Sequence, residues 1–216
     1  MSEDRHSQAD PVELIRDPLV KAQREAENGV RQFKAALELI RANILRPDTK
    51  FRLKQAHIIQ LHQLALDGIH PLAGTYRNTR VFIGKSDHLP PRHTEVADHV
   101  ADMCDFVSQN WDEQNAIYLA SYILWRMNWI HPFADGNGRT ARIVSYVVLS
   151  IKMDSLLPGT PTIPDQIAAD KKPYYSALEE ADRSWRIEKI DLSSMTAMME
   201  SMLATQLYKA TEEAGI

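Results

Sequence analysis

Cysteine, long apolar runs and clusters of basic residues are scarce in this chain of 216 residues, and each scarcity excludes a class of protein. The single cysteine, Cys104, excludes an intramolecular disulfide. The longest apolar stretch, residues 116–130, is too short to cross a bilayer and contains Arg126 and Asn128. The 25 basic and 29 acidic side chains include no run of Lys or Arg, so the electrostatic footprint of a nucleic-acid-binding protein is missing. We therefore expect neither a membrane nor a nucleic acid as partner.

The composition is that of a globular protein with a sizeable apolar core. Hydrophobic residues make up 44% of the chain, and the formal net charge is −4. These values fit one domain, or one domain with a helical extension. The first residues, Met-Ser-Glu-Asp-Arg-His-Ser-Gln, are polar and acidic, unlike a signal peptide, so we expect a cytoplasmic protein.

Apolar residues recur at helical intervals along most of the chain, which predicts an all-α fold. The predicted helices cover residues 11–45, 54–66, 94–107, 112–130, 140–151, 171–182 and 188–208. The sequence Glu27-Asn28-Gly29 predicts that the first segment forms either two helices or one interrupted helix. The fourth, with Asp112 as its N-cap, and the fifth are apolar nearly all round, so we expect them at the centre of a bundle. Residues 79–85 are the one predicted strand, although a buried loop fits this short segment nearly as well.

Residues 131–142, His-Pro-Phe-Ala-Asp-Gly-Asn-Gly-Arg-Thr-Ala-Arg, combine a titratable base, a carboxylate, two glycines and two arginines. Pro132 cannot continue the preceding helix, and glycines permit dihedrals that other residues avoid, so the segment forms a turn. The N–H groups of Gly136, Asn137 and Gly138 then lie at a helix N-terminus, where donors without helical partners and a positive dipole bind anions. This pattern predicts a phosphate-binding site.

The charged side chains of this run suit a nucleotide better than a single phosphate. Arg139 and Arg142 share one face of the first helical turn, where two guanidinium groups reach different oxygens of a polyphosphate. Asp135 would be repelled by phosphates unless a cation lay between them, which suggests a Mg²⁺ ligand. His131, when neutral, accepts a proton from an incoming hydroxyl and is the candidate general base. Each residue taken singly is also typical of a cap or turn, but capping does not explain the whole set.

The run resembles the signature of the Fic family: His-Pro-Phe, any residue, Asp or Glu, Gly-Asn-Gly-Arg, two residues, Arg. Every fixed position of that pattern is present here. The resemblance implies a Fic-type helical bundle and transfer of AMP from Mg²⁺-ATP to a Ser, Thr or Tyr hydroxyl of a target protein. It makes His131 the general base, Asp135 the Mg²⁺ ligand and Phe133 the anchor of the loop. The implied nucleotide-binding residues are Gly136, Asn137, Gly138, Arg139 and Arg142.

One position of the run bears on which group is transferred. The Doc branch of the family, which this chain resembles less, has Lys where Gly138 stands and transfers the γ-phosphate of ATP instead of AMP. Gly138 therefore favours AMP transfer.

Two further segments resemble Fic proteins. Residues 74–77, Gly-Thr-Tyr-Arg, precede the predicted strand, and in the family a β-hairpin flap at this place aligns the target by strand pairing. Main-chain hydrogen bonds align an extended peptide with little regard to its sequence. The residues that we expect to dock the target are Val81, Phe82, Ile83 and Gly84. Residues 172–178 resemble the start of a helix near the nucleotide base, so Tyr174 and Tyr175 lie either beside the base or in the core.

The resemblance also divides the chain. It implies an N-terminal helical extension over residues 1–49, a Fic core over residues 50–185 and a C-terminal helix over residues 186–216. Residues 23–29 resemble the inhibitory motif of the family, which is Ser or Thr, three residues, Glu, then Gly or Asn, except that Gln23 replaces Ser or Thr. The motif implies that Glu27 pairs with Arg142, blocks the γ-phosphate position and restrains self-modification. Alternatively, Glu27 is an ordinary solvated residue at a helix end.

Other functions stay open at this point. The same fold could remove AMP from a modified protein, transfer another nucleotide or phosphorylate as Doc does. A non-catalytic nucleotide-binding scaffold is the alternative of a different class, although binding alone needs neither His131 nor Asp135. The methionines of residues 195–199 either pack in the core or mediate oligomers.

Overall fold

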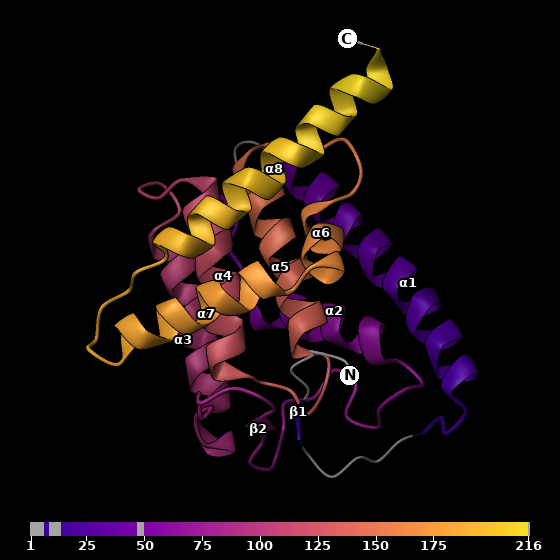
Figure 1. The fold of residues 1–216 in the computed structure, drawn as a ribbon, viewed down its shortest axis with the longest axis vertical. Coiled ribbons are helices and arrows are strands. Elements are labelled where there is room, and N and C mark those ends of the chain that lie inside the picture. Colours follow the sequence, from indigo (N-terminus) through magenta and orange to yellow (C-terminus); the bar gives the residue numbers. More distant parts are fainter. Residues whose placement is uncertain (1–6, 9–13, 47–49, 216) are drawn as a thin grey trace.

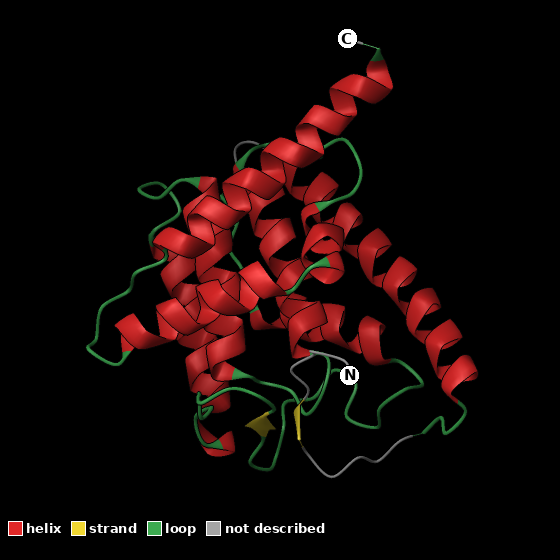
Figure 2. Ribbon diagram, viewed as in Figure 1, coloured by secondary structure: helices red, strands yellow, loops and turns green. Residues whose placement is uncertain are grey.

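The chain forms a bundle of helices with one short two-stranded ladder (Figures 1 and 2). The structure is a computed structural model that describes residues 7–8, 14–46 and 50–215. Its helices are α1 (Pro18–Ile44), α2 (Gln55–Leu66), α3 (Val96–Gln109), α4 (Ala116–Ile130), α5 (Asn137–Lys152), α6 (Ile163–Ala169), α7 (Lys172–Trp185) and α8 (Ser193–Ala214). A single 3₁₀ turn, His93–Glu95, precedes α3, and the strands are β1 (Ser7–Gln8) and β2 (Phe82–Ile83). The all-α prediction is confirmed.

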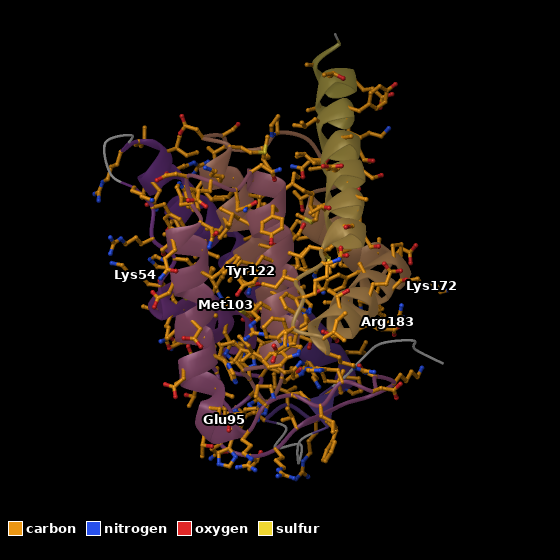
Figure 3. The ribbon with its side chains drawn as sticks, turned by 90° about the vertical axis from the view of Figure 1, so that its left-hand side faces the viewer. Lys54, Glu95, Met103, Tyr122, Lys172 and Arg183 are labelled. Atoms are coloured by element: carbon orange, nitrogen blue, oxygen red, sulfur yellow. The ribbon has the colours of Figure 1, made fainter. Side chains whose placement is uncertain are left out.

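Helices α4 and α5 form the centre of the bundle, as their apolar sequences predict. Every residue from 119 to 127 in α4 and from 143 to 151 in α5 is buried. The two helices pack most extensively against each other. Helices α1 and α2 also pack against α5, and helices α3, α7 and α8 pack against α4. In Figure 3, Met103 of α3 and Tyr122 of α4 lie between these helices, whereas Lys54, Glu95, Lys172 and Arg183 lie at the surface. The loop that joins α4 to α5 is therefore held from several sides.

Helix α1 is continuous, so the predicted break at residues 27–29 is wrong. Asn28 faces inward and is fully buried, and its Nδ2 donates to the carbonyl oxygens of Ala65 at 3.2 Å and Asp67 at 2.8 Å. These bonds satisfy an amide that would otherwise favour a turn. The helix begins at Pro18, with Asp17 as its N-cap, and not at the predicted residue 11, which lies outside the described residues.

Two other helix starts differ from the predicted ones. Asn115, not Asp112, caps α4, because its Oδ1 accepts a hydrogen bond from the N–H of Tyr118 at 2.8 Å. The Asp112 carboxylate instead lies 2.7 Å from Lys50 Nζ. Helix α8 begins at Ser193 rather than residue 188. The short helix α6 was not predicted. It is capped by Thr162 and carries Pro164 in its first turn, where proline is tolerated.

The predicted strand forms, but it does not pair with a strand next to it in the sequence, as it would in a β-hairpin. Phe82–Ile83 pairs antiparallel with Ser7–Gln8, so that Ser7 lies opposite Ile83 and Gln8 opposite Phe82. The ladder thus joins the N-terminal segment to the segment that precedes α3. It is a pairing between distant parts of the sequence, in place of the predicted β-hairpin.

Two remaining expectations concern surfaces. Met195 and Met199 are fully buried in the core, which favours packing over oligomer contacts for these two residues.

Within the described ranges, none of the helices combines the length and the apolar character needed to span a bilayer. The division into an extension, a core and a C-terminal helix stays a prediction.

Candidate functional site

His131 ends α4 in a left-handed backbone conformation, with φ 49° and ψ 60°. Its N–H still donates to the carbonyl oxygen of Met127, at 2.9 Å, so the chain leaves the helix within one residue. A residue with a Cβ avoids this region at a cost on the order of 1 kcal/mol, and such conformations gather at functional sites. The surrounding loop must supply the contacts that hold His131 there.

Asn137 and Phe133 supply the first of these contacts. The Asn137 side chain accepts from the Phe133 N–H at 2.9 Å and donates to the Phe133 carbonyl at 2.7 Å, which closes the loop at the start of α5. The Phe133 ring is fully buried and stacks on the His62 ring, with the centroids 3.6 Å apart. Phe133 therefore anchors the loop in the core, as the sequence implied.

His62 of α2 fixes the next part of the loop. Its Nδ1 accepts from the N–H of Gly74 at 2.9 Å, so the ring proton is on Nε2, which donates to the carbonyl oxygen of Asp135 at 3.0 Å. Burial lowers the pKa of His62 to about 4, so this neutral tautomer persists at neutral pH.

Gly136 is confined from the same side. It has φ 76°, and a Cβ there would lie 2.5 Å from Leu66 Cδ2 and 3.3 Å from His62 Nε2. Only glycine fits this position without displacing the side chain of Leu66.

Arg77 connects the loop between α4 and α5, residues 131–136, to the flap, which we define as residues 79–91. Its side chain is buried, and its guanidinium donates to the carbonyl oxygens of His131 (2.7 Å), Thr79 (3.0 Å), Pro91 (2.5 Å) and Ile130 (3.4 Å). The N–H of Arg77 also donates to the carbonyl of Pro132, at 2.9 Å. One side chain thus joins both ends of the flap to His131.

These elements enclose a cavity of about 570 Å³, a size typical of small-molecule sites. The predicted residues that line it are Ile83, His131, Asp135, Gly136, Asn137, Gly138, Arg139, Arg142, Tyr174 and Tyr175. The base, the carboxylate, the helix N-terminus and both arginines therefore meet in one place. Glu25 and Lys21 of α1 and Asn128 of α4 line the same cavity and were not predicted.

Part of the predicted docking set lies elsewhere. Val81 is buried, Phe82 is 54% exposed, and both line a second hollow of about 200 Å³ with Leu89 and Pro90. Gly84 lines neither of these two spaces. Of the four predicted flap residues, Ile83 is the one that borders the main cavity.

His131 is buried, and desolvation lowers its pKa to about 4. The imidazole is therefore neutral throughout the physiological pH range. A neutral imidazole that borders a cavity has the protonation state that a general base requires.

Arg139 lies between two carboxylates. Its Nη1 is 3.3 Å from Glu25 Oε1, and its Nη2 is 3.4 Å from Asp135 Oδ2. Glu27, the predicted inhibitory residue, instead accepts from Gln23 Nε2 at 3.0 Å and lies 3.7 Å from Arg24 Nε. The Glu27 side chain is 52% exposed and makes these contacts on its own helix, so the structure places Glu25, and not Glu27, against a motif arginine.

The two tyrosines differ in their surroundings. Tyr174 is buried, and its hydroxyl accepts from Asn128 Nδ2, one turn of α4 before His131. Tyr175 is half-buried, and the two rings lie with their centroids 6.0 Å apart. Both border the cavity, and Tyr174 also packs in the core, so the two interpretations offered by the sequence are compatible.

The donor set limits which metal ion the cavity could hold. Asp135 has a side chain that is 44% exposed, and no group of three or more metal-binding side chains occurs within the described residues. One carboxylate does not suit a cation held by protein ligands alone. It fits Mg²⁺ that takes its other oxygen ligands from a nucleotide and from water.

The fold and the loop together define a helical protein with an anion-binding turn between its two central helices. Residues 52–149 match the family model described as Fic/DOC family. This match assigns the domain that contains the loop, residues 52–149, to the Fic/DOC family.

Curated relatives carry the same domain in longer proteins. The chain is 30% identical over 157 residues to the protein adenylyltransferase Fic of Nematostella vectensis, covering 72% of this chain and 34% of that protein. It is 29% identical over 157 residues to the protein adenylyltransferase fic-1 of Caenorhabditis briggsae, covering 72% and 29%. The chain thus spans about a third of the length of these relatives.

Solved structures show the same fold. A fragment of Fic-1 from C. elegans superposes with a TM-score of 0.69 at 20% identity, covering 93% of this chain and 54% of that one. A Fic family protein from Desulfovibrio desulfuricans G20 superposes with a TM-score of 0.62 at 21% identity, covering 93% and 68%. At these identities the likeness concerns the fold alone.

Proposed function

We propose that this protein transfers AMP from ATP to a Ser, Thr or Tyr hydroxyl of a target protein, as the names of its curated relatives state for those proteins. The observation that carries the proposal is a shared cavity. A neutral His131, the N-terminus of α5 and the two arginines Arg139 and Arg142 line one space of about 570 Å³. An acceptor base and a polyphosphate site are the two parts that this reaction needs.

In the proposed step, the hydroxyl oxygen attacks the α-phosphorus of ATP, and the bond from that phosphorus to the oxygen bridging to the β-phosphate breaks. Pyrophosphate leaves with that oxygen, and the hydroxyl proton passes to His131. Because His131 is neutral, it accepts the proton without first losing one. The N–H groups that begin α5 and the arginines hold the phosphates while charge moves to the leaving group.

Asp135 is the residue that would hold Mg²⁺, since it is the motif carboxylate bordering the phosphate site. The ion would neutralise phosphate charge and orient the leaving group. Without the ion, Asp135 and the triphosphate would repel each other across the same space.

Gly138 and the tyrosines support AMP as the group transferred. A Cβ at Gly138 would lie 3.5 Å from Arg142 Nη1, so a lysine there would extend beside the arginine proposed to hold the γ-phosphate. Tyr174 and Tyr175 offer aromatic surface for a nucleotide base. A structural neighbour, BepC from Bartonella tribocorum, has bound AMPPNP, at a TM-score of 0.57 and 14% identity.

The target would dock on the flap. Strand β2 provides main-chain groups for pairing, and Ile83 borders the cavity that holds His131. We place the reaction in the cytoplasm, with proteins, including the protein itself, as acceptors and with no nucleic acid involved.

We further propose that α1 restrains the reaction through Glu25. Its carboxylate forms an ion pair with Nη1 of Arg139 and adds negative charge to the cavity that must admit a triphosphate. The Arg139 and Glu25 side chains are 30% and 38% exposed, and partly exposed ion pairs contribute about 1 kcal/mol or less. The restraint is therefore a few-fold effect that ATP binding can overcome, and not a complete block.

The test is the intact mass of the protein after incubation with ATP and Mg²⁺. We expect the mass of the protein to increase by that of AMP. The rate of this addition should rise a few-fold in Glu25→Gln and stay unchanged in the matched variant Glu27→Gln. An increase in Glu27→Gln alone would restore the sequence-based assignment. An added phosphate would indicate Doc-like kinase chemistry. Removal of AMP from a modified protein would show that the reaction runs in the opposite direction. Nucleotide binding without any transfer would indicate a non-catalytic scaffold.

A further inference from the structure

The peptide unit that joins Asp135 to Gly136 lies between α2 and the main cavity. Its carbonyl oxygen, which belongs to Asp135, accepts a hydrogen bond from His62 Nε2 at 3.0 Å. Helix α2, which carries His62, packs against α5 (Figure 1). The N–H at the other end of the unit belongs to Gly136, which lines the cavity. One end of this peptide unit is therefore held by α2, and the other borders the proposed phosphate site.

The bond from His62 determines the direction of the Gly136 N–H. A trans peptide unit is planar, and its C=O and N–H groups point in opposite directions. Because the Asp135 carbonyl points toward α2, the Gly136 N–H points away from α2, to the side of the cavity. No acceptor among the described residues takes a hydrogen bond from this N–H. It is a donor for a phosphate oxygen at the start of α5.

Glycine at position 136 makes the opposite orientation of the peptide unit accessible. Gly136 has φ 76°, and glycine adopts φ of either sign at little cost. Rotation of the unit by half a turn would place the Asp135 carbonyl oxygen in the cavity, where it would repel a phosphate that the N–H would otherwise bind. Among the described residues, His62 is the one donor to this carbonyl oxygen.

Resting on the proposed AMP transfer, we propose that His62 is a positioning residue of the phosphate site, because it keeps the Gly136 N–H directed at the nucleotide phosphates. His62 is not among the residues that line the cavity, so it acts through the main chain. Its own ring is held by the N–H of Gly74 and by the stack on Phe133. Loss of its bond to Asp135 should weaken the binding of phosphates and leave the binding of the base and ribose unchanged.

The experiment compares the native protein with His62→Asn and His62→Gln by calorimetric titration. Both variants lack the ring that stacks on Phe133. The glutamine amide reaches the position of Nε2 and keeps a donor for Asp135, whereas the asparagine amide reaches only the position of Nδ1, next to Gly74. The probes are AMPPNP with Mg²⁺, which is not hydrolysed, and adenosine, which has no phosphate.

We expect the affinity for AMPPNP to fall about tenfold or more in His62→Asn, because a hydrogen bond to a charged group contributes at least that much. His62→Gln should stay within a few-fold of the native protein, and the affinity for adenosine should be the same in all three. Native affinity for AMPPNP in His62→Asn would overturn the inference. An equal loss in both variants, or an equal loss for both probes, would assign His62 a merely structural role and would also overturn it.

A measurement on the native protein does not depend on how the variants fold. In the amide NMR spectrum of the labelled protein, AMPPNP with Mg²⁺ should shift the Gly136 N–H resonance, and adenosine should leave it in place. A Gly136 resonance that AMPPNP does not move would contradict the proposed direction of this N–H.

The mass of AMP added to the native protein or to lysate proteins separates this inference from the proposed function. Transfer of AMP together with native AMPPNP affinity in His62→Asn overturns the inference alone. The expected affinities without any transfer support the inference and overturn the proposed function. Neither binding of AMPPNP nor transfer by the native protein overturns both.

Discussion

The loop between α4 and α5 and the flap border the same cavity, but different kinds of contact hold them in place. The loop is fixed by buried groups on every side, namely Asn137, His62 and Arg77, each of which bonds its main chain. The flap is clamped at its two ends by Arg77, and its strand consists of two residues paired with a distant segment. The proposed chemistry is therefore assigned to a rigidly held loop, and the proposed docking of the acceptor to a strand that is held by fewer contacts.

This difference has a physical reason. A base and a phosphate site must be positioned before the reaction, because their contribution depends on groups that do not reorganise as charge moves. An edge strand recognises main chain, so one short edge can accept different segments in turn. The proposed function thus combines a preorganised reaction site with a docking edge at β2.

The largest expected difference between the loop and the flap is in how much one phenylalanine of each contributes to the free energy of unfolding. Phe133 is fully buried in the loop, and Phe133→Ala should lower the free energy of unfolding by about 3–5 kcal/mol. Phe82 in the flap is 54% exposed, and Phe82→Ala should change it by about 0.5 kcal/mol or less. Urea unfolding of both variants measures the difference, and equal losses would mean that the flap is packed as firmly as the loop.

The second test uses pH. Burial lowers the pKa of both His62 and His131 to about 4, below the value of about 6.5 expected in the unfolded chain. Between these values the unfolded state binds more protons, so stability is complete above about pH 6.5 and is lost as the pH falls toward 4, by roughly 3 kcal/mol for each histidine. Urea unfolding at a series of pH values measures this slope. A free energy of unfolding that stays constant over that range would show that neither ring is desolvated.

A third and smaller effect on stability distinguishes Gly136, the N-cap of α5, from Gly138 in its first turn. Gly136→Ala places a Cβ 2.5 Å from Leu66 Cδ2 at φ 76°, and it should cost about 2 kcal/mol of stability. Gly138→Ala meets only Arg142 Nη1, at 3.5 Å, and should change stability by less than about 1 kcal/mol. Thermal unfolding of the two variants gives the comparison, and a loss in Gly138→Ala as large as in Gly136→Ala would contradict the geometry.

What the sequence predicted correctly is what depends on nearby residues. The apolar helices on either side of residues 131–136, the turn itself and the start of α5 follow from local patterns, and the motif residues do line one cavity. Phe133 also takes the buried position that the motif implied.

What the sequence did not predict depends on contacts between distant segments. His62, Arg77 and Glu25 reach the site from other elements, and no local pattern marks their partners. Asn28 was interpreted as a break in α1 because its two carbonyl partners lie far along the chain. The partner of β2 was missed for the same reason, since Ser7 and Gln8 carry no strand signal of their own.

The most direct test of the central claim is the rate of AMP transfer by the native protein and by His131→Ala, each measured with ATP and Mg²⁺ between pH 6 and 8. A neutral base whose pKa is about 4 predicts a rate for the native protein that is nearly independent of pH over this range. His131→Ala should be slower by about 10²–10⁴-fold while keeping the native unfolding curve. A folded His131→Ala that transfers AMP at the native rate would contradict the account.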